Sequence, residues 1–259
     1  MSAPILEIRA VSKHFGGVLA LDAVSLNIAA GSRHVIIGPN GSGKSTLINV
    51  LSGVYAPDKG EVLFQGQKIT GLPAYLITAK GIARTFQSIR PFKGMTVWEN
   101  IAVGVHCRTG YGLWEAILRC GREPAERKKI EAKVAELAEF FGINDLLSEK
   151  VQSLPYGKQR IVEIARALAS EANLLLLDEP AAGMNAAEAQ ALAASIKRIT
   201  GLGATVVLIE HNMEFVKEIA DIITVLDSGE KIAEGSFADV QANKRVVEAY
   251  LGKRVAAHA

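Results

Sequence analysis

The segment GPNGSGKST, at residues 38–46, limits the possible fold more than any other stretch of the chain. It fits the pattern GxxxxGK[ST], follows the apolar run HVII and leads into STLINVLSG, which has a helical pattern. Its glycines let successive backbone N–H groups point into one concavity at the positive end of a helix, which suits an anion. We therefore predict a strand, a phosphate-binding loop and a helix, with the candidate binding residues Gly38, Pro39, Asn40, Gly41, Ser42, Gly43, Lys44, Ser45 and Thr46.

Three continuous apolar runs predict the centre of a parallel sheet. Residues 34–38, 174–178 and 205–211 have the composition of strands that are buried on both faces. Helical patterns lie between and around these strands, at residues 45–53, 126–142, 157–170 and 187–200. Strands that alternate with helices indicate an α/β core.

Other segments have features of hairpins. Residues 5–11, 61–69 and 221–235 combine short apolar runs, partial alternation and glycine turns. We expect these pieces, which come from both ends of the chain, to form an antiparallel side sheet. The segment from about 88 to 160 is nearly all helical in pattern and interrupts the alternation, so we interpret it as an inserted subdomain.

The composition excludes several classes of protein. The 259 residues are 49% hydrophobic and 22% charged, which is typical of a globular protein, and the net charge of +2 gives no reason to expect nucleic acid as a partner. No apolar run approaches the roughly 18–20 residues that span a bilayer, and the opening residues lack the pattern of a secretory signal. Cys107 and Cys120 lie far apart without a metal-binding pattern, so we expect reduced thiols and a cytoplasmic protein.

Acidic and histidine side chains follow the predicted central strands. Asp178 ends the run LLLLD, where a carboxylate can hold the hydration shell of Mg²⁺ beside a phosphate-binding loop. Glu179 follows it, projects in a different direction and could orient or deprotonate an attacking water. His211 ends the run TVVLIEH and could contact a γ-phosphate, although a histidine at a strand end is usually only a loop residue. Lys44 can reach the β- and γ-phosphates, and the Ser45 hydroxyl can bind Mg²⁺.

Together these motifs resemble the ATP-binding subunits of ABC transporters over essentially the whole chain. The ordered set is KHFGG, GPNGSGKST, ARTFQ, MTVWENI, SLPYGKQR, LLLLDEP, AAGMN and IEH, and its order and spacing are more specific than any one motif. Within that family the chain is most similar to the branched-chain amino acid (LivG-type) ATPases, because of its FGG start, Pro-Tyr-Gly signature and IAEG…VVEAYLG ending.

The resemblance implies roles for further residues. Phe15 falls where an aromatic ring stacks on adenine, and the alternative is a phenylalanine of the core or a turn. Gln87 would reach the Mg²⁺ or the attacking water, while its loop contacts the membrane subunits. Asn185 stands where the family usually has Asp, in a loop that communicates between two ATP sites. An apolar segment past Gln87 is either subdomain core or a groove for a helix of a membrane subunit, and it contains Ile89, Pro91, Phe92, Met95 and Trp98.

The stretch SLPYGKQR aligns with the family signature Leu-Ser-Gly-Gly-Gln, which faces the ATP of a partner subunit. The usual serine hydroxyl is absent, so phosphate recognition would depend on the backbone around Gly157, the helix end and Lys158. The alternative is a helix that begins at a proline and binds nothing. We predict that the stretch works as a signature, with the residues Leu154, Pro155, Tyr156, Gly157 and Lys158.

The resemblance implies a P-loop NTPase (RecA-like) core with an antiparallel side sheet and an inserted α-helical subdomain. We predict a first part of the nucleotide-binding core over residues 1–87 and a helical signature subdomain over 88–160. The second part of the core would span residues 161–235, and a C-terminal helical tail would span 236–259.

The predicted function is ATP hydrolysis, with ATP and Mg²⁺ as cofactors, that drives uptake of branched-chain or related amino acids. The implied partners are a second ATPase subunit in a nucleotide sandwich, two integral-membrane permease subunits and, indirectly, a solute-binding protein. The chain would then lie at the cytoplasmic face of the cell membrane. One alternative is the ATPase subunit of a lipid or lipopolysaccharide exporter. A less favoured alternative is a non-transport ABC switch acting on nucleic acid or the ribosome.

Overall fold

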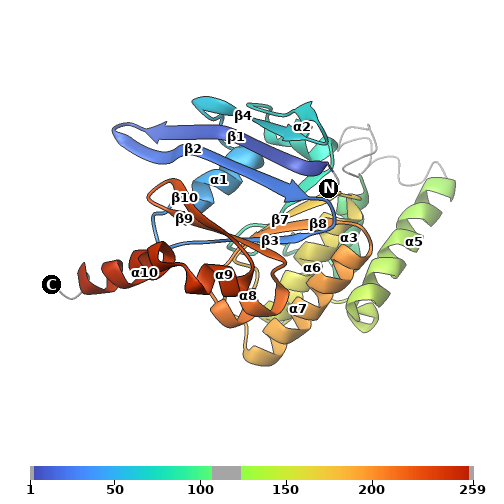
Figure 1. Ribbon diagram of the computed structural model, residues 1–259. Coiled ribbons are helices and arrows are strands. Elements are labelled where there is room, and N and C mark those ends of the chain that lie inside the picture. Colours follow the sequence, from blue (N-terminus) through green and yellow to red (C-terminus); the bar gives the residue numbers. More distant parts are fainter. Residues whose placement is uncertain (1–2, 107–123, 257–259) are drawn as a thin grey trace.

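The computed structural model describes residues 3–106 and 124–256, which form two β-sheets with helices around them (Figure 1). Helix α1 (Lys44–Leu51) packs between the two sheets, while other helices cover the opposite face of the larger sheet. Alternate residues of one central strand show this layering, because Leu174 and Leu176 face α1 whereas Leu175 and Leu177 face the other helices. The predicted α/β class is therefore confirmed.

The larger sheet has the strand order β10-β9-β3-β8-β7-β6. The three predicted core strands are β3 (Arg33–Ile37), β7 (Leu174–Asp178) and β8 (Thr205–Ile209), and β8 pairs in parallel with both of the others. Every residue of β7 and β8 is buried, which explains their continuous apolar runs. Because parallel strands end at the same edge of a sheet, the segments that follow these three strands converge there.

The C-terminal hairpin corrects one expectation. Strand β9 (Ile222–Asp227) pairs in parallel with β3, and β10 (Glu230–Gly235) pairs antiparallel with β9 at the edge of the larger sheet. Residues 221–235 therefore do not join the antiparallel side sheet, as the sequence suggested. The physical reason is that β9 is buried on both faces, with Ile223 packed against the helices and Leu226 toward α1.

The side sheet has the order β2-β1-β4-β5, and among the described residues all of its strands come from the N-terminal part of the chain. Its strands are β1 (Pro4–Phe15), β2 (Val18–Ala29), β4 (Lys59–Phe64) and β5 (Gln67–Lys68). The sequence patterns missed β2 and also the short edge strand β6 (Ile82–Arg84) of the larger sheet. Register shifts between β1 and β2 interrupt the alternation that would have marked β2 as a strand.

All four predicted helical segments form helices, whereas two further short helices of the core, at residues 74–79 and 213–219, were not predicted. Helix α2 (Ala74–Ala79) packs on the α1 side of the larger sheet, and α6 (Tyr156–Ala169), α7 (Ala186–Gly201) and α8 (Met213–Ile219) pack on its opposite face. The expected C-terminal tail contains α9 (Phe237–Ala242) and α10 (Lys244–Ala256). Among the residues that the structure describes, no helix combines the length and apolarity needed to cross a membrane.

A third hydrophobic cluster belongs to the helical insertion. It joins one face of α6, with Val162, Ala165 and Ala169, to α3 (Val97–His106), α5 (Pro124–Phe141), η1 (Asn144–Leu146) and η2 (Val151–Ser153). The boundary placed at residue 160 falls inside α6, so this helix connects the insertion to the core. Cys107 and Cys120 lie outside the described residues.

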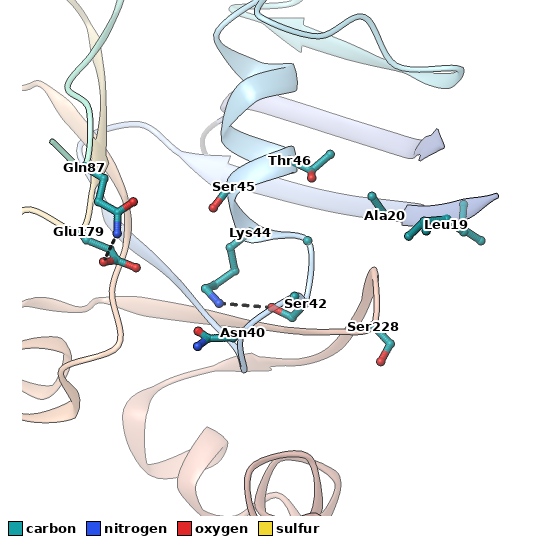
Figure 2. Close-up of a pocket in the computed structure, with 13 residues that line it drawn as sticks. Leu19, Ala20, Asn40, Ser42, Lys44, Ser45, Thr46, Gln87, Glu179 and Ser228 are labelled. Atoms are coloured by element: carbon teal, nitrogen blue, oxygen red, sulfur yellow. Dashed lines mark hydrogen bonds between the residues drawn. The ribbon is translucent and has the colours of Figure 1, made fainter. Parts of the chain in front are cut away.

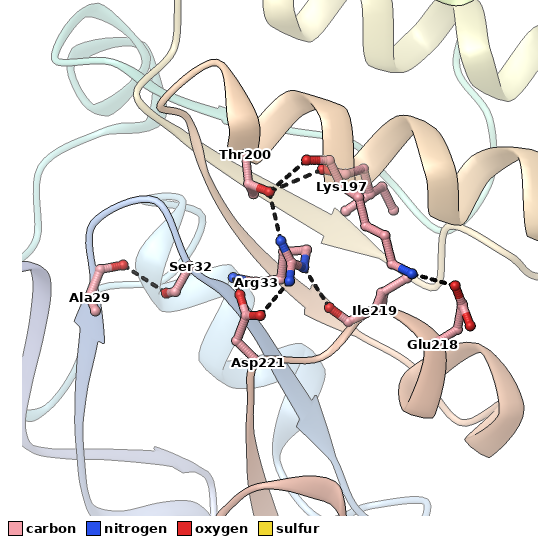
Figure 3. A network of polar contacts seen from close by, with 9 residues as sticks. Ala29, Ser32, Arg33, Lys197, Thr200, Glu218, Ile219 and Asp221 are labelled. Atoms are coloured by element: carbon pink, nitrogen blue, oxygen red, sulfur yellow. Dashed lines mark hydrogen bonds and ion pairs between the residues drawn. The ribbon is translucent and has the colours of Figure 1, made fainter.

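Arg33 fixes the edge of the larger sheet that is remote from the phosphate loop (Figure 3). Its backbone N–H donates to Asp221 Oδ2 at 2.8 Å, and its guanidinium donates to the Ile219 carbonyl at 2.7 Å and to Thr200 Oγ1 at 2.9 Å. The third guanidinium nitrogen, Nη2, pairs with Asp221. These bonds tie the start of β3 to α7 and to the segment before β9, so they hold the register in which the strand ends meet.

Candidate active site

Residues 38–43 connect β3 to α1 in a conformation that two positions restrict to glycine. Gly38 has φ 153°, and a Cβ there would lie 2.1 Å from the Leu226 carbonyl oxygen. Gly43 has φ 100°, and a Cβ there would lie 2.5 Å from the Ala20 carbonyl oxygen. Since L side chains rarely adopt such φ values and these neighbours are backbone atoms, the loop needs both glycines to reach its shape.

Lys44 is folded back over this loop (Figure 2). Its Nζ donates to the carbonyl oxygens of Gly38 at 2.7 Å and Pro39 at 2.9 Å, and it lies 3.5 Å from Ser42 Oγ. The side chain is only 8% exposed, and the first turn of α1 has no acidic residue. The loop therefore presents a positive side chain and the positive end of a helix together, which is the arrangement that binds phosphate.

A pocket of about 590 Å³ opens beside the loop (Figure 2). Its walls come from the phosphate loop, from the start of β2, from Gln87 and Glu179 and from the β9–β10 turn. The predicted lining residues are Asn40, Gly41, Ser42, Gly43, Lys44, Ser45, Thr46, Gln87 and Glu179, and the patterns missed Val18, Leu19, Ala20 and Ser228. Its size lies within the range of small-molecule sites.

Glu179 lies between the two other predicted catalytic residues. Gln87 Nε2 donates to Glu179 Oε2 at 2.9 Å, and His211 Nδ1 lies 3.6 Å from Glu179 Oε1. Glu179 has φ 46°, a left-handed conformation that is uncommon outside glycine and is often found at functional sites. The structure thus brings together three side chains that lie far apart in the sequence.

Asp178 is buried at the end of β7 and pairs with a different side chain. It is 8% exposed, and Arg84 Nη2 donates to its Oδ2 at 3.2 Å. Burial raises the pKa of the Asp178 carboxyl, and the charge of Arg84 opposes that rise. Arg84 also donates to Asn49 Oδ1 and Ser52 Oγ, so it joins β7 to α1. The sequence patterns did not single out Arg84, although it lies within the motif ARTFQ.

Two of the three residues predicted to bind Mg²⁺ line the pocket. The Ser45 hydroxyl and the Gln87 amide line the pocket, and Asp178 lies buried at the end of the neighbouring strand. Within residues 3–106 and 124–256 no three His, Cys, Asp or Glu side chains form a metal cluster. This donor set fits Mg²⁺, because that ion is usually held by one or two protein oxygens, with phosphates and water as its remaining ligands.

Phe15 does not line the pocket. It is the last residue of β1 and is 40% exposed, and the centre of its ring lies 5.1 Å from that of the Tyr55 ring in an edge-to-face arrangement. The Lys13 ammonium lies 5.5 Å from its centre. Apolar side chains nearer the loop are Val18 and Leu19, which are themselves exposed.

The signature residues form the start of α6 and do not line this chain's own pocket. Pro155 precedes the helix, Tyr156 and Lys158 are exposed, and Leu154 is buried. Gly157 is buried against Glu188 of α7, since a Cβ on Gly157 would lie 2.7 Å from Glu188 Oε1.

Asn185 begins α7. Its side chain accepts a hydrogen bond from the Glu188 N–H at 3.0 Å, and the Glu188 carboxylate accepts one from the Asn185 N–H at 3.0 Å. This reciprocal capping box explains why an asparagine suits the position structurally.

Comparisons with known proteins agree with this geometry. The ABC transporter family model matches residues 21–182, which contain the phosphate loop, the signature and the strand that ends in Asp178. The chain belongs to the ABC transporter family. Its C-terminal residues 230–256 match a second model, described as a branched-chain amino acid ATP-binding cassette transporter.

Curated relatives cover nearly the whole chain of this ABC protein. A probable branched-chain amino acid transport ATP-binding protein LivG of Archaeoglobus fulgidus is 38% identical over 96% of this chain and 95% of its own. The high-affinity branched-chain amino acid transport ATP-binding protein BraF of Pseudomonas aeruginosa is 37% identical over 98% of this chain and all of its own.

Solved structures share the fold. The ADP conformation of an ATP-binding cassette of an ABC transporter is 35% identical, with a TM-score of 0.85 over 97% of this chain and all of that one. A dimeric ATP-binding cassette in a post-hydrolysis state, bound to ADP and Pi, is 26% identical, with a TM-score of 0.74 over 90% of this chain and 98% of that one.

Proposed function

We propose that this ABC ATPase drives import of branched-chain or related amino acids through separate membrane subunits. The observation that carries the proposal is the Glu179 carboxylate, held between Gln87 and His211 at the pocket beside Lys44. The match of residues 230–256 to the branched-chain amino acid model and the names of the full-length relatives support the solute class. They do not favour a lipid or lipopolysaccharide exporter.

Each side chain has a proposed part in hydrolysis. The loop N–H groups and Lys44 would bind the β- and γ-phosphates of ATP, and Glu179 would orient and deprotonate the attacking water. Gln87 and His211 would hold Glu179 and contact the water or the γ-phosphate. Ser45, Gln87 and Asp178 would hold Mg²⁺, which supplies charge neutralisation to the phosphates when bound.

Adenine would rest against the apolar side chains at the edge of the pocket. Leu19 and Val18 line it directly, and Phe15 ends β1, just before the turn that leads to them. We propose that Phe15 stacks on the adenine base once the β1–β2 turn moves toward the pocket. Its ring is already exposed and therefore available for stacking.

The signature is proposed to act on a second subunit. Residues 154–158 lie outside this chain's pocket, and the exposed Lys158 and the backbone N–H groups at the start of α6 can approach an anion from outside. The dimeric relative bound to ADP and Pi supports a nucleotide-sandwich dimer.

The proposed membrane partners would dock beside Gln87. Phe92 and Met95, a few residues further along the chain, are exposed apolar side chains, whereas Trp98 packs into the helical subdomain. Two permease subunits would receive this surface, a solute-binding protein would act with them, and the chain would lie at the cytoplasmic face of the membrane.

Substitution of Glu179 tests the proposed chemistry. We expect Glu179→Gln to abolish steady-state ATP hydrolysis while ATP binding persists, because the amide cannot take a proton from water. The variant should accumulate as an ATP-bound dimer, measurable by size-exclusion chromatography with light scattering.

The matched control is Glu139→Gln, which makes the same change at an exposed position of α5. It should hydrolyse ATP like the wild type. Wild-type turnover in Glu179→Gln would rule out the general-base assignment. Solute-stimulated hydrolysis by the complex with its permeases, assayed with leucine and with a lipid substrate, would then decide between the two transport classes.

A further inference from the structure

Glu210 is a carboxylate in the interior, directly after β8. It is 1% exposed, although glutamate is rarely buried so completely without partners. It lies between Ile209, which pairs with Asp178 across the parallel strands, and His211. Its own backbone N–H lies 3.4 Å from the Ile36 carbonyl oxygen, on the strand that leads to the phosphate loop. Glu210 is thus anchored where three functional segments meet.

The side chain of Glu210 contacts two separate turns. Its Oε1 accepts the Ala181 N–H at 2.9 Å, in the turn that follows Glu179. Its Oε2 accepts the N–H groups of His211 at 3.1 Å and Asn212 at 3.3 Å. All three partners are donors, which suits the two acceptor oxygens of a carboxylate. One side chain therefore sets the spacing between the backbones that carry Glu179 and His211.

The turn that Glu210 holds is the strained one. Glu179 has φ 46°, and a non-glycine residue in that region persists only when the surroundings hold it there, at a cost of about 1–3 kcal/mol. The Glu179 N–H donates to the Ile209 carbonyl at 3.0 Å, and the Ala182 N–H donates to the Glu179 carbonyl at 3.1 Å. The bond from Ala181 to Glu210 closes the turn from the other side. If that turn relaxed, the Glu179 carboxylate would leave the position between Gln87 and His211.

We propose that Glu210 is a positioning residue for ATP hydrolysis, which holds Glu179 and His211 in register by accepting hydrogen bonds from both of their turns. The inference rests on the proposed function, since it assigns Glu210 an effect on the catalytic carboxylate. Glu210 does not line the nucleotide pocket. It acts on turnover and leaves the phosphate-binding contacts of Lys44 and the loop in place.

Two substitutions at this position provide the test, in the full-length chain. Glu210→Gln keeps the shape but turns one acceptor into an N–H donor that faces a backbone N–H. Glu210→Asp keeps both acceptors with a shorter reach. We expect Glu210→Gln to lower kcat by about 10- to 100-fold, the effect of a small misplacement of a reacting group. The dissociation constant for ATP should be unchanged, and Glu210→Asp should restore part of the lost kcat.

A double-mutant cycle with His211→Ala shows whether Glu210 acts through the catalytic side chains. Because the two residues belong to one unit, the combined loss of kcat should be smaller than the product of the single losses. Glu139→Gln is the control for the change of charge and should match the wild type.

Three results would overturn the proposal. These are a wild-type kcat in Glu210→Gln, strictly multiplicative losses in the cycle, or a parallel loss of ATP binding and kcat in both the Gln and Asp variants. The last would mean that Glu210 supports the fold as a whole. An inactive wild-type chain in the presence of ATP and Mg²⁺ would instead contradict the proposed function, and this inference with it.

Discussion

At the residue scale, the signature stretch departs from the family pattern, and its surroundings show how it is supported. The Tyr156 ring lies against Gly183, where a Cβ would be 3.5 Å from the ring, and Gly157 lies against Glu188. The first turn of α6 therefore rests on the loop that follows Glu179 and on the start of α7. Because of these contacts, a phosphate that binds to the signature of one chain would also affect the position of the loop that follows Glu179 in the same chain.

Substitutions of Gly157 test whether the signature binds phosphate. Gly157→Asp should abolish ATP hydrolysis by the assembled complex, because it brings a second carboxylate to Glu188 at the place where a partner's phosphate would dock. Gly157→Ala, which adds only a methyl group next to the movable end of Glu188, should retain most of the activity. ATPase assays of the complex give the measurement.

The double variant Gly157→Asp/Glu188→Ala separates charge from crowding. It removes the clash and one of the two carboxylates but keeps a negative charge at the signature. If the signature binds phosphate, the double variant should remain inactive. Full recovery of activity would show that the stretch only packs against α7.

At the element scale, helix starts fix the loops that carry the site. Asn185 and Glu188 cap α7 reciprocally, and Ser236 and Asp239 do the same for α9. Each box satisfies N–H groups that a helix leaves unpaired at its first turn. The cap of α7 also ends the loop that begins at Glu179, so it limits how far that loop can move.

Substitutions of Asn185 test how much the N-cap of α7 stabilises the protein. Asn185→Ala should lower the free energy of unfolding by about 1 kcal/mol, since alanine cannot accept the Glu188 N–H. Asn185→Asp, the residue usual in the family, should keep or raise stability, because aspartate accepts the same bond and adds a negative charge at a helix N-terminus. Urea denaturation followed by circular dichroism measures both. Equal unfolding midpoints for Asn185→Ala and the wild type would contradict the assigned cap.

At the scale of the whole molecule, the centre of the larger sheet contains a buried histidine. His34 of β3 is fully buried, and its Nε2 lies 2.8 Å from Thr224 Oγ1, whose hydroxyl donates to Glu234 at 3.1 Å. Because that hydroxyl proton is used, Thr224 accepts from His34 Nε2–H. Within the described part of the chain, His34 Nδ1 has no hydrogen-bond partner. Burial lowers the pKa of His34 to about 4; the charge of Glu234 opposes this effect and that of Lys231 adds to it, both to a smaller extent.

This histidine makes global stability depend on pH. The pKa is about 6.5 in the unfolded chain and about 4 in the fold, so the unfolded state binds the proton more tightly. The stability is therefore complete above pH 6.5 and falls as the pH drops from about 6.5 to about 4, by about 3 kcal/mol over that window.

Unfolding experiments at pH 7 and pH 4.5 on the wild type and His34→Gln measure the effect. The variant, which cannot take up a proton at this position, should lose less stability between the two pH values. Equal losses in both proteins would show that His34 does not titrate as described.

Much of the fold and site follows from local patterns. The glycines and lysine of residues 38–46, the apolar runs of β7 and β8 and the period of α5 each depend on a few neighbouring residues, and the structure agrees with them. The same runs placed Asp178, Glu179 and His211 at strand ends. Local patterns thus suffice to predict the phosphate loop, the parallel core and which polar residues lie near it.

Which of these groups are in contact depends on how the whole chain packs. In the structure the C-terminal hairpin belongs to the larger sheet, Phe15 lies outside the pocket, and Arg84 donates a hydrogen bond to Asp178. Glu210 also lies beneath the turns of Glu179 and His211. The physical reason is that a periodic pattern reports which face of an element is buried but not which distant element covers it. Contacts between strand ends depend on strand order and register, which the whole chain fixes at once.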